Sequence, residues 1–180
     1  FGPDLIAFSL VENTYDLGLQ LLNRIPNSIP VAMGGVFPTY ASEICINEPK
    51  VTFAVRGEGE FPMLELCNAI ANGDSLKNIM NVWYKNKDGD IFRNQLRPAT
   101  NLAELPIPDY TIYEEALFYT PMQGKVWKII GFETQRGCPY TCTYCNSPSN
   151  NYTYKAENAG NFYRKKPIPQ LKIELDRLIK

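Results

Sequence analysis

The sequence contains no histidine among its 180 residues, no long apolar run and no excess of charge of one sign. The absence of histidine excludes imidazole as a metal ligand anywhere in the chain. No apolar run approaches the roughly 18 residues of a membrane-spanning helix, so we expect no membrane partner. A formal net charge of -1 gives no reason to expect a nucleic-acid partner.

The C-terminal part of the chain is more basic than the rest. Residues 151–180 carry seven Lys or Arg against three Asp or Glu, which we interpret as a solvated face or a contact between domains. The first apolar run, PDLIAFSL, begins almost at once and without an initiator Met, so we expect a piece of a longer protein. Five cysteines without a secretory signal favour a reducing compartment, and we expect a cytoplasmic location.

The first half of the sequence alternates strand-like and helix-like segments. Short apolar runs end at Ser9, at Gly34 and Gly35, and at Gly57. Helical periodicity separates them, and in FPMLELCNAIANG it places Leu64, Cys67 and Ala71 on one apolar face that ends at Gly73. This order predicts an α/β fold with a partial doubly wound parallel sheet. Ligands of such sheets bind at the carboxyl ends of the strands.

The second half predicts a different organisation. Asp88-Gly89 indicates a tight hairpin within residues 81–96, and Pro106 and Pro108 indicate a linker. We expect one strand over 125–135, a polar loop over 146–154, and a helix over 167–180. The predicted domains are therefore 1–75, an α/β domain; 76–125, a hairpin and linker; and 126–180, the first strand, loop and helix of a partial (β/α) barrel.

Three of the cysteines lie close together in RGCPYTCTYCN, at Cys138, Cys142 and Cys145. We interpret Cys45 and Cys67, which stand singly among apolar residues, as free core thiols. A disulfide would leave the third clustered thiol unexplained. Structural zinc needs four ligands, and the fourth would have to be Cys45, Cys67 or a carboxylate, so a zinc-stabilised binding module stays an alternative. Three thiolates suit a 4Fe-4S cluster with an open coordination position on one iron.

The spacing Cys138-x3-Cys142-x2-Cys145 after a strand resembles the signature of radical S-adenosylmethionine enzymes. The resemblance implies that these cysteines ligate three irons of a 4Fe-4S cluster, and that S-adenosylmethionine chelates the fourth. The reduced cluster would cleave the sulfonium to methionine and a 5'-deoxyadenosyl radical. Tyr144 matches a family residue that packs near the adenine.

Upstream, PDLIAFSL, VAMGGVFPT and VRGEGE, followed by a hairpin and ELPIPDY, resemble the cobalamin-binding domain of a subgroup of this superfamily. The resemblance implies that Ser9, Gly34 and Gly35 line the groove for the nucleotide tail of cobalamin, with Gly57 and Glu58 as further candidates. The plainer interpretations are a tight turn at the glycine pair and a favourable charge at the start of the next helix for Glu58 and Glu60. Without histidine, no imidazole can be the lower axial ligand of cobalt.

The resemblance as a whole implies an enzyme that performs methyl transfer to an unactivated carbon or a radical ring-forming step. It implies an electron donor such as flavodoxin or ferredoxin and a small-molecule substrate that the sequence does not identify. We expect the rest of the barrel to follow residue 180, and this chain alone to be inactive. A truncated, inactive gene product is the other alternative, and no catalytic acid or base is assigned.

Overall fold

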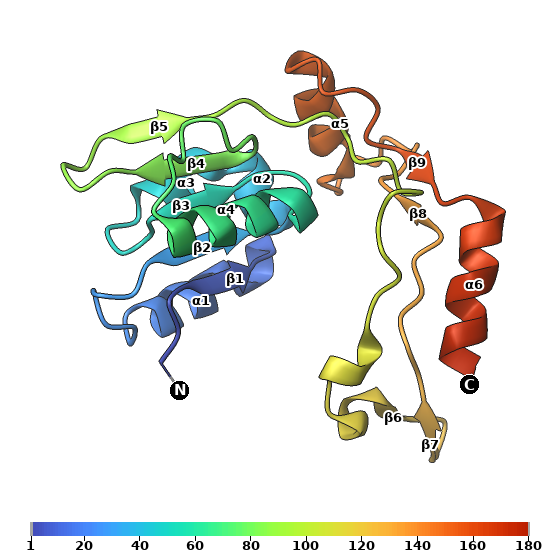
Figure 1. The fold of residues 1–180 in the computed structure, drawn as a ribbon. Coiled ribbons are helices and arrows are strands. Elements are labelled where there is room, and N and C mark those ends of the chain that lie inside the picture. Colours follow the sequence, from blue (N-terminus) through green and yellow to red (C-terminus); the bar gives the residue numbers. More distant parts are fainter. Residues whose placement is uncertain (1, 180) are drawn as a thin grey trace. The chain divides into compact units, whose positions relative to one another are not determined.

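The computed structural model describes residues 2–179, and these form two compact units (Figure 1). The first, called here the α/β unit, comprises the described residues up to Ala99 together with Tyr140–Asn161. The second unit comprises Thr100–Pro139 and the described residues from Phe162 onward. The chain passes from one unit to the other three times, and one of these boundaries falls between Pro139 and Tyr140, inside the cysteine motif.

The α/β unit is built on one five-stranded sheet with the strand order β1-β2-β3-β4-β5. The first three strands are parallel, and β4 and β5 extend the sheet as an antiparallel hairpin. The strands are β1 (Ile6–Ser9), β2 (Val31–Gly34), β3 (Phe53–Val55), β4 (Val82–Lys85) and β5 (Ile91–Arg93). The α/β fold with a mostly parallel sheet is confirmed, and so is the hairpin whose turn contains Asp88 and Gly89.

Helices cover both faces of this sheet because its buried strands are apolar on both sides. One face packs against α1 (Tyr15–Leu22), α2 (Val36–Tyr40) and α3 (Ser42–Asn47), and its core includes Val31 and Met33. The other face packs against α4 (Glu60–Asn72), and its core includes Ala32 and Leu66. Successive residues of β2 thus enter opposite cores, as the pleat of a strand requires.

The buried face of α4 differs from the predicted one. Leu66 and Ala69 are buried, whereas Leu64 is 58% exposed and Cys67 is exposed. The helix is apolar on more than one side, so periodicity alone did not determine which side meets the sheet. Its end is as predicted, because Gly73 adopts the left-handed conformation with φ 73°.

The described part of the second unit contains two antiparallel two-stranded ladders, two short 3-10 helices and one α-helix. Its elements are β6 (Tyr119–Met122), β7 (Lys125–Lys128), β8 (Gln135–Arg136), β9 (Arg164–Lys165) and α6 (Ile168–Ile179). The single strand expected over 125–135 is therefore wrong. Gln123 and Gly124 both have positive φ, 53° and 75°, which makes a tight turn that folds β7 back onto β6. The predicted helix over 167–180 is confirmed over Ile168–Ile179, and residue 180 lies outside the described residues.

The polar loop expected over 146–154 is also wrong, because α5 (Ser147–Ala156) occupies it. Asn146 is the N-cap and Pro148 lies in the first turn, where proline is tolerated because the N–H has no helical partner. Tyr154, only 1% exposed, provides the buried contact that a polar helix needs. Asn146 followed by Pro148 is a helix-start signal that favours a helix over a loop in this segment.

Candidate cofactor-binding site

A pocket of about 300 Å³ lies at the carboxyl ends of β1, β2 and β3 in the α/β unit. Its walls are formed mainly by small and apolar side chains, among them Phe8, Val55 and Met63. Four residues predicted for the site line it: Ser9, Gly34, Gly35 and Gly57. The parallel strands end at the same edge of the sheet, so the structure brings these separated residues together.

Two of these glycines are required by the local backbone. Gly35 has φ 97°, and a Cβ there would lie 2.8 Å from the backbone N and O of Leu10. Gly57 has φ 67°, and a Cβ there would lie 2.5 Å from the Tyr154 hydroxyl. L-residues rarely adopt positive φ, so glycine is favoured at both positions by conformation and by space.

Thr39, which is buried in α2, connects the two glycine turns and was not identified from the sequence. Its hydroxyl donates to the Gly35 carbonyl oxygen at 2.7 Å and accepts the Gly57 N–H at 2.9 Å. This one side chain therefore fixes the turn after β2 relative to the turn after β3. No short motif marks Thr39, because its role depends on the adjacency of two strands.

Glu58 is buried but is not among the residues lining this pocket. Its backbone carbonyl oxygen accepts a hydrogen bond from the Asn81 amide at 3.1 Å. Glu60 is the first residue of α4, where its charge is favourable to the helix dipole. The position of Glu60 agrees with the plainer helix-start interpretation, whereas a cofactor role for Glu58 stays a prediction.

The cysteine motif follows β8 and leads into α5. Gly137, with φ 77°, makes the turn before Cys138, and a Cβ there would lie 2.7 Å from the Phe162 carbonyl oxygen. Cys142 and Cys145 are exposed, and the Cys145 N–H donates to the Cys142 carbonyl oxygen at 3.2 Å. Tyr144 is 91% exposed. The turn before the motif thus favours glycine, and the exposed thiols after it have the donor chemistry that an iron-sulfur cluster requires.

In residues 2–179, no three His, Cys, Asp or Glu side chains are grouped closely enough to hold a metal ion. The three cysteines are therefore related by their spacing along the chain rather than by a preformed cage. Metal sites commonly close only as the metal binds, so this open arrangement is compatible with a cluster-binding loop.

The remaining cysteines are free, as predicted, but they differ in burial. Cys45 is 0% exposed, whereas Cys67 is exposed, which corrects the expectation that both are core thiols. Burial raises the pKa of the Cys45 thiol to about 12, and the nearby Glu48 carboxylate adds to this shift. Cys45 therefore stays a protonated thiol at neutral pH, which makes it a poor metal ligand.

These environments predict different thiol reactivities. At pH 8, iodoacetamide should modify Cys67 and leave Cys45 unmodified, because Cys45 is buried and its pKa lies about four units above that pH. Peptide mass spectrometry checks this, with both thiols labelled in urea as the control. Equal labelling of the two thiols in the native protein would contradict the described burial of Cys45.

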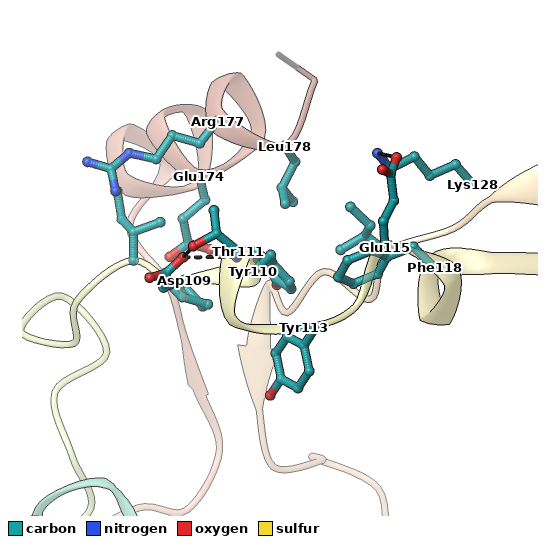
Figure 2. A pocket seen from close by; sticks show the side chains of 13 residues that line it. Asp109, Tyr110, Thr111, Tyr113, Glu115, Phe118, Lys128, Glu174, Arg177 and Leu178 are labelled. Atoms are coloured by element: carbon teal, nitrogen blue, oxygen red, sulfur yellow. Dashed lines mark hydrogen bonds and ion pairs between the residues drawn. The ribbon is translucent and has the colours of Figure 1, made fainter.

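A larger pocket, of about 840 Å³, lies in the second unit between residues 107–118 and α6 (Figure 2). Figure 2 shows Tyr110, Thr111 and Phe118 on one side and Arg177 and Leu178 on the other. Lys128 pairs with Glu115 at 3.1 Å and lowers the pKa of that carboxyl group. None of the residues predicted for the site lines this pocket. We therefore take the smaller pocket, where four of them meet, as the candidate site.

No family model matches the chain, but individual proteins do. The uncharacterized methyltransferase of Pyrococcus horikoshii is 31% identical over 153 residues, which is 82% of this chain and 32% of that protein. The anaerobic magnesium-protoporphyrin IX monomethyl ester cyclase of Synechocystis sp. is 35% identical over 136 residues, 72% of this chain and 25% of that protein. The chain thus spans about a quarter to a third of the curated relatives it matches.

Solved structures show the same fold. The radical S-adenosylmethionine methyltransferase TsrM from Kitasatospora setae superposes with a TM-score of 0.63 at 17% identity, over 99% of this chain and 35% of that one. OxsB, a cobalamin-dependent S-adenosylmethionine radical enzyme, superposes with a TM-score of 0.69 at 20% identity, over 98% of this chain and 23% of that one. In its overall similarity the chain therefore resembles the cobalamin-dependent radical S-adenosylmethionine enzymes, as its cysteine spacing and its glycine turns predicted.

Proposed function

We propose that this chain is the cofactor-binding part of a radical S-adenosylmethionine enzyme. The observation that carries the proposal is the close spacing of three thiols between β8 and α5 in a chain without histidine. Cys142 and Cys145 are exposed, and Cys138 is partly exposed. These three thiolates would hold three irons of a 4Fe-4S cluster, and S-adenosylmethionine would occupy the fourth, with Tyr144 near its adenine. When bound, the reduced cluster supplies one electron for cleavage of the sulfonium.

The pocket at the carboxyl ends of β1–β3 is the proposed place for the nucleotide tail of cobalamin. Ser9 supplies a hydroxyl group at the strand end, and Gly34 and Gly35 let a ligand approach the backbone. TsrM has been solved with cobalamin and a [4Fe-4S] cluster bound, and OxsB with aqua-cobalamin and S-adenosylmethionine bound, which supports the assignment. Any lower axial ligand of cobalt in this chain would have to be something other than histidine.

The reaction we propose is methyl transfer or radical cyclisation on a small molecule. Both kinds of activity occur among the names of the relatives, as methyltransferase and as cyclase. The enzyme would need an electron donor such as flavodoxin or ferredoxin, and would act in the cytoplasm. Within residues 2–179, no helix combines the length and the apolar character that crossing a membrane requires.

The zinc alternative is weakened by the position of one candidate ligand. Cys45 belongs to α3 and is fully buried in the core, and its raised pKa keeps the thiol protonated. A thiolate ligand from this position would require the core to open. Cys67, the other candidate thiol, lies on α4, whose buried face packs against the opposite side of the sheet from Cys45.

Electron paramagnetic resonance tests the proposal directly. The full-length protein would be reconstituted with iron and sulfide under anaerobic conditions, reduced, and measured with and without S-adenosylmethionine. We expect a reduced 4Fe-4S signal that changes when S-adenosylmethionine is added, because the open iron gains two ligands. A colourless protein that retains zinc and unfolds with a chelator would favour the zinc-stabilised module instead.

A further inference from the structure

Helix α5 begins directly after the last cysteine of the motif. Asn146 is its N-cap, and Ser147 is its first residue. The Ser147 N–H donates to the Cys145 sulfur at 3.4 Å. Hydrogen bonds from the backbone to ligand sulfurs help to set the reduction potential of iron-sulfur clusters. The environment of Cys145 therefore depends on where the first turn of α5 lies.

The start of α5 is held by the α/β unit. The Asn146 side-chain amide donates to the hydroxyl oxygen of Tyr40, in α2, at 2.9 Å. The Tyr40 ring packs edge-on against Phe37 with a centroid separation of 5.5 Å, and Phe37 is buried in the core. Asn146 is thus anchored to a side chain that the core itself immobilises.

The end of α5 is held by a second, stronger contact in the same unit. Arg56, whose side chain is 8% exposed, forms a bidentate ion pair with Glu157, the C-cap residue of α5. The guanidinium carbon lies 4.7 Å from the centre of the Trp83 ring, and Glu157 also accepts the Leu96 N–H at 3.1 Å. Removing one partner of such a pair would leave the other charge poorly solvated.

Tyr154 fills the space between these two contacts. Its side chain is fully buried, and its hydroxyl lies over Gly57, where a Cβ would clash. The same Gly57 lines the candidate pocket. Helix α5 therefore contacts one lining residue of the pocket through Tyr154, and its first residue bonds the last cysteine of the motif.

We propose that α5 is a positioning helix for Cys145, held by Tyr40 at its start and by the Arg56–Glu157 pair at its end. This inference rests on the proposed cluster function, because it assigns what orients one of the cluster ligands. Tyr40, Arg56 and Glu157 are positioning residues, and they act through the helix rather than on the reacting atoms. The Tyr40–Asn146 hydrogen bond and the Arg56–Glu157 ion pair together maintain the hydrogen bond from the Ser147 N–H to the Cys145 sulfur.

The test compares two conservative variants with matched controls in the full-length protein. Tyr40→Phe removes the hydroxyl that accepts the Asn146 amide. Its control is Tyr15→Phe, because the Tyr15 ring also packs against Phe37. The hydroxyl lost in the control donates to the Glu48 carboxylate at 2.9 Å. Glu157→Gln neutralises the ion pair, and its control Glu43→Gln neutralises the exposed bidentate pair with Arg93. Arg93 also lies over Trp83, at 5.3 Å, so the two pairs share that neighbour.

Two measurements separate the inference from the proposed function. In the metal-free protein, hydrogen exchange of peptides covering 146–156 should be roughly fivefold faster or more in Tyr40→Phe and Glu157→Gln than in their controls. In the reconstituted protein, both variants should release iron to a chelator about tenfold faster than their controls, with an altered signal of the reduced cluster. Far-UV circular dichroism checks folding, and if Glu157→Gln fails to fold, Tyr40→Phe decides the test.

The inference is overturned if both variants match their controls in hydrogen exchange and in iron release. It is also overturned if α5 exchanges faster while the cluster signal and iron release stay unchanged, since the helix would then not position Cys145. If the wild-type protein assembles no cluster, the proposed function fails. Hydrogen exchange in the metal-free protein then still decides whether these side chains hold α5.

Discussion

Replacing Cys142 by alanine is expected to abolish assembly of the 4Fe-4S cluster and reductive cleavage of S-adenosylmethionine in the full-length protein. The cluster needs every thiolate that the protein supplies, because one iron must stay open for the cofactor. Cys142 is exposed on the loop, so its replacement removes a ligand without disturbing a core. Iron and sulfide analysis, absorption spectroscopy and detection of 5'-deoxyadenosine provide the measurements.

Cys67→Ala is the matched control for this experiment. Cys67 is also exposed and free, but it lies on α4 rather than in the cysteine motif. We expect this variant to assemble the cluster and to cleave S-adenosylmethionine like the wild type. Retention of both properties in Cys142→Ala would contradict the proposed function, whereas their loss in both variants would indicate a general effect on folding.

Replacing Gly57 by alanine is expected to destabilise the α/β unit by about 2–4 kcal/mol. The first cause is the backbone, because φ 67° is unfavourable for a residue with a Cβ. The second is the 2.5 Å approach of that Cβ to the Tyr154 hydroxyl, which would force Tyr154 and α5 to move. Hydrogen exchange of peptides from β2, β3 and α5 at increasing urea concentration measures the change in free energy.

Gly73→Ala separates the two causes. Gly73 has nearly the same conformation, with φ 73°, but a Cβ there would meet nothing within 4 Å. We expect this variant to lose only about 1 kcal/mol, the conformational cost alone. Equal losses at both positions would show that Tyr154 adapts freely, and that Gly57 is needed for its conformation only.

The sequence alone predicted the features whose causes are local. Apolar runs that end at Ser9, at Gly34 and Gly35, and at Gly57 predicted the three parallel strands and their ends, and Asp88-Gly89 predicted the hairpin. Gly73 marked the end of α4 because a left-handed residue commonly ends a helix. The spacing of Cys138, Cys142 and Cys145 indicated the chemistry, because ligands of one cluster can come from a single loop. The gathering of Ser9, Gly34, Gly35 and Gly57 followed from the geometry of parallel sheets.

Other features depend on residues that are far apart in the chain and could not be predicted from local pattern. Periodicity in α4 did not determine that Leu66 rather than Leu64 would be buried. The polar segment that became α5 is stabilised by Tyr154 against Gly57 and by Glu157 with Arg56, about 100 residues upstream. Similarly, Thr39 bonds two turns that only the sheet brings together.

The reason for this division is physical. Turn conformation, helix ends and ligand spacing are governed by interactions within a few residues, which a sequence displays directly. The choice of buried face, the folding of a weakly helical segment and the closing of a buried ion pair depend on which distant surfaces meet. The sequence by itself thus determined the strand ends and the cysteine spacing. Only the tertiary structure decided that Gly57 would contact Tyr154 of α5, the helix that begins beside Cys145.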